Sequence, residues 1–145
     1  MLRDISKDYV DFLVNHGTFH IIDHQGVEWC RLLTPDESLR LMKWLAEYIR
    51  DDDMGPSDSD RKAAHAEQAV RRNLYPFQYC EESTRQNLYC FYKSKVKDGL
   101  PSICPIAHDD YRVADWIHEE REGDVYTFEK HICRMIDEIM NDEFP

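Results

Sequence analysis

Residues 87–97, NLYCFYKSKVK, are the stretch on which the fold class depends, because they fit two different structures. Apolar and polar residues alternate there as in an edge strand. Four apolar residues of the stretch also fall at helical spacing: Leu88, Phe91, Tyr92 and Val96. Ser83 is a candidate N-cap with Gln86 three residues later, and Gly99-Leu100-Pro101 is typical of a helix stop. These flanking signals favour a helix over residues 83–97.

The N-terminal third predicts a helix, a β-hairpin and a second helix. Residues 4–16 place apolar side chains at helical spacing. Over residues 18–32 the period changes to two, and Asp23-His24-Gln25-Gly26 fits a turn that ends in a left-handed glycine. Thr34-Pro35-Asp36-Glu37 then combines an N-cap, a first-turn proline and a capping-box glutamate. The helix that starts there should run to about Arg50.

The rest of the chain predicts mostly helix. Residues 51–60, DDDMGPSDSD, read as a mobile polar loop, and residues 61–73 as an alanine-rich helix. After an extended proline-containing segment, a helix capped near Asp109 and ending near Gly123 precedes a final helix that reaches about Asn141.

These elements predict one domain, residues 1–145, of the helix-rich α+β class. It has one N-terminal β-hairpin, at about 18–32, packed by five or so helices, and it ends in a C-terminal helical hairpin. A chain of 145 residues with 42% hydrophobic residues can bury such a core. We expect a cytoplasmic protein without a membrane segment, because no apolar run reaches 18 residues and no leader is recognisable. The five cysteines are then expected to be reduced.

A zinc site is one hypothesis for the cysteines. Cys104 and His108 are separated by three residues, a spacing that one tetrahedral ion can bridge. Cys80 and Cys90 would complete the ligand set, but nine residues separate them, so the usual second short-spaced pair is missing. No cofactor is therefore the expectation, with zinc as the alternative.

A basic and aromatic middle segment, residues 61–97, is the second candidate site. Residues 58–97, which include it, hold 8 basic and 5 acidic residues. Stacking rings and phosphate-binding cations are the components of a single-stranded nucleic-acid surface. The residues that would form it are Arg71, Arg72, Tyr75, Phe77, Lys93 and Lys95. The alternative is that these rings fill the core.

The acidic C-terminal part is the third candidate, and the one that we favour. Residues 98–145 hold 13 acidic and 4 basic residues of a chain whose net charge is −11. Such a carboxylate array can attract a basic partner surface. The expected contact residues are Asp115, Glu119, Glu120, Glu122 and Asp124.

The sequence thus predicts a small acidic non-catalytic interaction protein, a regulator or inhibitor that docks on a protein partner. A nucleic-acid-handling machine is one candidate class of partner, and a homodimer is left open. The alternative is a small nucleic-acid-binding module. An enzyme is the third choice, because no nucleophile and base, and no pair of carboxylates, stands at a defined spacing.

Overall fold

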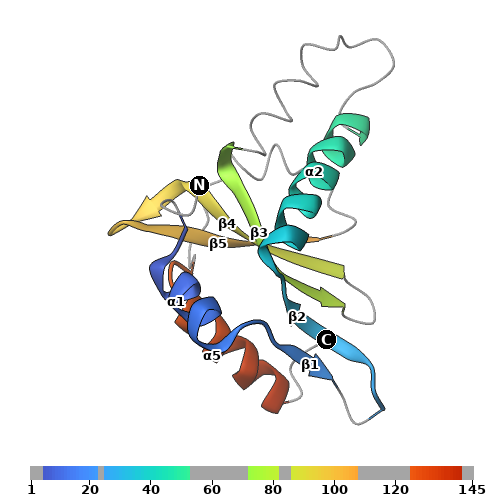
Figure 1. The fold of residues 1–145 in the computed structure, drawn as a ribbon, viewed down its shortest axis with the longest axis vertical. Coiled ribbons are helices and arrows are strands. Elements are labelled where there is room, and N and C mark those ends of the chain that lie inside the picture. Colours follow the sequence, from blue (N-terminus) through green and yellow to red (C-terminus); the bar gives the residue numbers. More distant parts are fainter. Residues whose placement is uncertain (1–4, 23–24, 53–71, 82–85, 108–124, 142–145) are drawn as a thin grey trace.

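The computed structural model describes residues 5–22, 25–52, 72–81, 86–107 and 125–141 (Figure 1). Its elements follow in this order: α1 (Lys7–His16), β1 (His20–Ile22), β2 (Glu28–Leu32), α2 (Pro35–Asp52), β3 (Leu74–Glu81), β4 (Gln86–Lys97), β5 (Leu100–Ala107) and α5 (Phe128–Met140).

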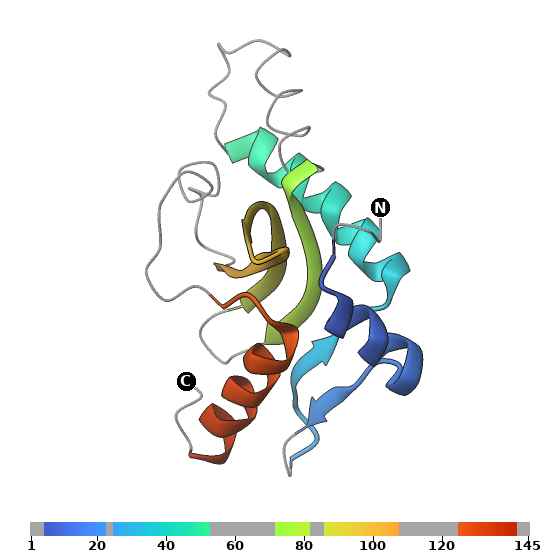
Figure 2. The ribbon, with the colours of Figure 1, turned by 90° about the vertical axis from the view of Figure 1, so that its left-hand side faces the viewer.

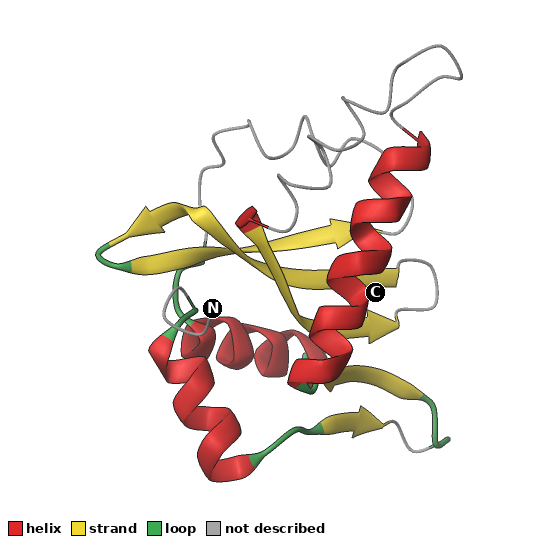
Figure 3. Cartoon of the chain, turned by 45° about the horizontal axis from the view of Figure 1, so that its top comes forward, coloured by secondary structure: helices red, strands yellow, loops and turns green. Residues whose placement is uncertain are grey.

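The five strands of the described ranges form one antiparallel sheet, in which each strand pairs with the next along the chain (Figure 3). The hairpin predicted over residues 18–32 is confirmed as β1 and β2. A two-residue turn, Asp98–Gly99, joins β4 and β5 between the paired residues Lys97 and Leu100. Both turn residues have positive φ, 52° and 77°, as a type I′ hairpin turn requires.

The helix predicted over residues 83–97 is wrong, because β4 is the longest strand of this sheet. β4 lies between β3 and β5, and apolar side chains cover both of its faces. Such a strand carries a near-continuous apolar run instead of an alternating one, and a continuous run also fits helical spacing.

The helix-rich fold class with five or so helices is therefore wrong as well. The described ranges hold three helices beside the five strands, and the antiparallel sheet is the centre of the fold. The segment expected to be extended around its prolines is β5, the strand at one edge of the sheet.

Helices pack on both faces of the sheet, since alternate residues of a strand point to opposite faces. Leu88 and Cys90 of β4 pack in a cluster with Leu45 of α2. Phe91, the residue after Cys90, packs instead with Tyr9 of α1 and with Phe128, the first residue of α5. In Figure 2, β3 runs from beside α2 to the beginning of α5.

The helix ends follow local signals. The capping box predicted at Thr34 and Glu37 is confirmed, because each residue's backbone N–H donates to the other's side chain, at 3.3 and 2.8 Å. Thr127 caps α5 by accepting from the backbone N–H of Lys130. Asp8 of α1 also accepts from the N–H of Glu129, at 3.1 Å, which ties α1 to the start of α5.

Other predictions fall outside the described residues. The loop predicted over 51–60 begins too early, because Asp51 and Asp52 belong to α2, and the rest of it is not described. The helix predicted over 61–73 is described only at residues 72 and 73, which are helical, and the one predicted over 109–123 is not described. Among the described helices, none combines the length and apolar character needed to cross a bilayer.

Candidate functional site

The candidate site is a buried polar cluster between the sheet and α5, built around Gln78 of β3. The β3–β4 register shifts by one residue between Pro76 and Gln78. A bulge of this kind leaves two successive side chains on the same face. Phe77 packs with α1 and α5, and Gln78 bonds to α5 side chains, so the bulge directs both residues toward this layer.

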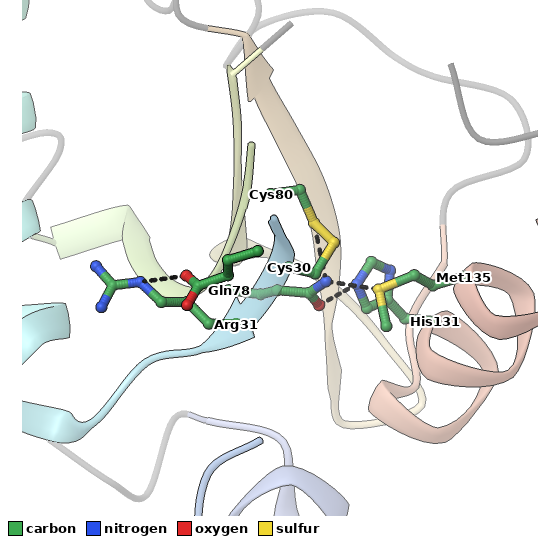
Figure 4. Close-up of a disulfide and its surroundings, with 7 residues drawn as sticks. Cys30, Arg31, Gln78, Cys80, His131 and Met135 are labelled. Carbon is green, nitrogen blue, oxygen red and sulfur yellow. Dashed lines mark hydrogen bonds and ion pairs between the residues drawn. A yellow bond between two sulfur atoms is a disulfide. The ribbon is translucent and has the colours of Figure 1, made fainter. Parts of the chain in front are cut away.

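Gln78 connects a disulfide to two side chains of α5 (Figure 4). Its amide nitrogen donates to Sγ of Cys80 at 3.2 Å and to Sδ of Met135 at 2.7 Å. Its amide oxygen lies 2.8 Å from Nε2 of His131. Because an amide oxygen only accepts, His131 carries its proton on Nε2 and donates it. Both amide hydrogens and the amide oxygen of Gln78 are therefore paired.

His131 is held neutral in this cluster. Its side chain is buried against the rings of Phe77 and Tyr89, with centroids 5.5 and 4.6 Å away. Burial, and to a lesser extent the nearby positive charge of Arg134, lower the pKa of His131 to about 4. A neutral imidazole that donates from Nε2 matches the acceptor that Gln78 offers.

The disulfide of the cluster joins Cys30 of β2 to Cys80 of β3, which are direct cross-strand partners with Cα atoms 4.1 Å apart. The expectation that all five cysteines are reduced is therefore wrong for this pair. The backbone N–H of Leu32 donates toward β1, to Phe19, whereas that of Leu33 donates toward β3, to Phe77. Because the direction of the backbone hydrogen bonds alternates along a strand, the N–H and C=O of Cys30 point away from β3. Cys30 and Cys80 therefore form a non-hydrogen-bonded pair. Side chains approach most closely at such pairs.

Cys90 and Cys104 are also cross-strand partners, but at the other kind of position. The N–H of Ile103 donates to Val125, away from β4, so the next pair, Cys104 and Cys90, is a hydrogen-bonded one with side chains farther apart. Both side chains are buried on the α2 side of the sheet. Burial raises the pKa of the Cys90 thiol above its ordinary value, which makes it a poor nucleophile and metal ligand.

The structure does not bring the predicted zinc ligands together. Cys80 is bonded to Cys30 on the α5 side, whereas Cys90 and Cys104 pack on the α2 side. His108 lies outside the described residues. Within the described ranges, no group of three or more histidine, cysteine or carboxylate side chains is placed to hold a metal ion.

The predicted nucleic-acid residues are separated by burial. Tyr75 and Phe77 lie in the core, 4% and 0% exposed, so their rings are not available to stack on bases. Arg72 is exposed, and Lys93 and Lys95 are partly exposed. Arg71 lies outside the described residues. The alternative reading, in which the rings fill the core, is what the structure shows for Tyr75 and Phe77.

The predicted partner-binding residues all lie outside the described residues: Asp115, Glu119, Glu120, Glu122 and Asp124. Of residues 109–143, the acidic part expected to make the contact, the structure describes residues 125–141, and most of these form α5. One side of this helix exposes Glu129, Cys133, Ile136 and Met140, which are spaced by four, three and four residues. This is the spacing of the contact seam between two packed helices.

Sequence reasoning missed the cluster of Cys30, Gln78, Cys80, His131 and Met135. One available signal was the spacing of His131 and Met135, four residues apart on the apolar stripe of the last helix. Comparison with protein families, with curated proteins and with solved structures found no match.

The chemistry open to the cluster follows from its burial. Cys30, Gln78 and Cys80 are 0% exposed, so no substrate reaches them in this conformation. The arrangement can hold α5 on the sheet and can undergo thiol–disulfide exchange when that contact opens.

Proposed function

We propose that this chain is a non-catalytic interaction protein, a regulator or inhibitor, that binds a protein partner with a basic surface. The contact would be made by the acidic C-terminal part, residues 109–143. A net charge of −11, concentrated in this part, supports a basic partner through electrostatic steering.

The outer face of α5 is the single observation that carries the proposal. Ile136 and Met140 are 47% and 77% exposed, although apolar side chains gain by burial. Acidic Glu129 stands on the same seam, and Asp137 is exposed next to it. Exposed apolar residues at seam spacing beside carboxylates suit a partner that offers both an apolar strip and positive charge.

Three of the chemically reactive groups in the described ranges support a non-catalytic role, since their contacts are internal. His131 donates to Gln78, Cys30 is bonded to Cys80, and Cys90 is buried with a raised pKa. An active site needs such groups within reach of substrate.

We also propose the cytoplasm as the location. Disulfides are rare in a reducing cytosol and, where they occur, are usually catalytic or redox-sensing. In the cytoplasm, the Cys30–Cys80 bond would therefore have a redox role. Nucleic-acid binding is not proposed, because Tyr75 and Phe77 are core residues.

The experiment that tests the proposal compares two charge reversals of equal size in affinity capture with the full chain. One variant carries Glu119→Lys, Glu120→Lys and Glu122→Lys. The matched control carries Asp51→Lys, Asp52→Lys and Asp53→Lys. The proposal requires a partner that wild type and control both retain and that the C-terminal variant loses.

A further inference from the structure

We propose that the Cys30–Cys80 disulfide is a redox switch for the packing of α5 on the sheet. It does not depend on the partner proposed above. In the oxidised state the bond and α5 protect each other, and in the reduced state the contact between them loosens.

The Cys30–Cys80 bond lies at the end of a short strand pairing. β2 pairs with β3 over only three register positions, from Cys30 with Cys80 to Leu32 with Gln78. The disulfide stands at one end of this short pairing and fastens the β1–β2 hairpin to the sheet. Met135 of α5 packs in one buried cluster with both cysteines of the bond.

Gln78 couples the bond to the helix. The amide group of Gln78 donates to Sγ of Cys80 and to Sδ of Met135, and it accepts from Nε2 of His131 (Figure 4). Any displacement of Cys80 therefore disturbs two side chains of α5 through one amide. Because these groups are buried, water does not replace a lost partner while α5 stays docked.

Reduction of the bond requires more space between the two sulfur atoms. A dithiol reductant supplies two electrons and two protons, Cys30 and Cys80 become thiols, and the reductant closes into its own disulfide. Bonded sulfur atoms lie about 2 Å apart, whereas nonbonded heavy atoms pack at about 3.5–4 Å. Both cysteines are 0% exposed, so the added separation has to displace a packed neighbour.

The neighbour that moves is the element held less firmly at this site. β3 is paired with β4 over its length, whereas the contacts described between α5 and this site are the side-chain contacts of residues such as His131 and Met135. The displacement therefore falls on α5 and on the edge hairpin. The same geometry controls access, because a reductant reaches the sulfur atoms only when α5 has moved away.

Hydrogen exchange of the full chain, oxidised or treated with dithiothreitol, tests the switch. We expect amides of α5 to exchange about tenfold faster or more after reduction, as for local opening of one element, with β4 and β5 unchanged. The control is Cys30→Ala with Cys80→Ala, whose exchange should not respond to dithiothreitol. Equal α5 exchange in both states, equal loss across β4 and β5, or a response in the control overturns the proposal.

The rate of reduction by dithiothreitol gives a second, independent readout. Met135→Ala removes the helix side chain that packs on the bond and should accelerate reduction about tenfold or more, since α5 opening limits access. Asp137→Asn, at an exposed position of the same helix, should leave the rate unchanged. Equal rates for the two variants would show that α5 does not control access, and would overturn the proposal.

Discussion

Gln78 of β3 and His131 of α5 are joined by a 2.8 Å hydrogen bond between buried groups that are 53 residues apart in the chain. This bond links the sheet directly to the C-terminal helix. It fixes the tautomer of the imidazole and orients the amide toward two sulfur atoms.

His131 should make the protein less stable in mild acid. Its pKa is about 4 in the folded state and 6.5 in the unfolded state, so below pH 6.5 the unfolded state binds more protons. The contribution is present above pH 6.5 and is lost as the pH falls to 4, a change of about 3 kcal/mol. Urea unfolding at several pH values measures it. His131→Gln should flatten this part of the profile, and His16→Gln, at an exposed position, should not. Equal profiles for wild type and His131→Gln would contradict the account.

Gln78→Leu should destabilise the protein by about 1–3 kcal/mol, because the Nε2–H of His131 loses its buried acceptor. The double variant Gln78→Leu with His131→Leu should lose less unfolding free energy than the two single variants together, since no buried donor is then left without an acceptor. A double-mutant cycle from unfolding free energies gives the coupling, for which about 0.5–3 kcal/mol is expected for contacting residues. A coupling of zero would mean that the two side chains do not interact.

The disulfide should contribute substantially to stability. Its cysteines are 50 residues apart, and loop closure of that length gives about 4 kcal/mol in the chain-entropy model. Unfolding of Cys30→Ala with Cys80→Ala, compared with oxidised wild type, measures the contribution. Cys133→Ser, at an exposed position, is the control and should be near neutral. A double variant as stable as wild type would argue against the bond.

Gly99→Ala tests the strand assignment of residues 86–107. Gly99 has a φ of 77° in the turn between β4 and β5, and a side chain in the left-handed region costs about 1–2 kcal/mol. Asp98→Asn keeps a residue type that tolerates positive φ and should be nearly neutral. A stabilising Gly99→Ala would be the result for a helical segment and would contradict the turn.

The charge-reversed C-terminal variant should lose its partner without losing its fold. Because Glu119, Glu120 and Glu122 act through charge in this proposal, the melting temperature should change little while affinity falls. Retained binding of the partner, or equal loss in the Asp51, Asp52 and Asp53 variant, would contradict the assigned surface.

Local signals were sufficient where one short segment determines its own structure. The capping box at Thr34 and Glu37 and the antiparallel pairing of β1 with β2 depend on residues close together in the chain, and both were predicted. β4 was not, because its helical or extended state depends on strands that cover it from both sides. Asp98-Gly99 is a typical type I′ turn, but the proline that follows favoured a helix stop.

The candidate site could not be predicted from the sequence, because it depends on register. The bulge at Phe77 determines which side chain of β3 faces α5, and the parity of hydrogen bonding separates Cys30–Cys80 from Cys90–Cys104. Neither property is encoded by residue spacing along a single strand.

Peptide mapping of the unreduced protein, after denaturation and alkylation, tests the central arrangement most directly. The account predicts one linked pair, Cys30 with Cys80, and alkyl groups on Cys90, Cys104 and Cys133. Alkylation of all five cysteines even after exposure to oxidised glutathione would contradict the Cys30–Cys80 bond and the redox role with it. A link between Cys90 and Cys104 would contradict the hydrogen-bonded position assigned to that pair.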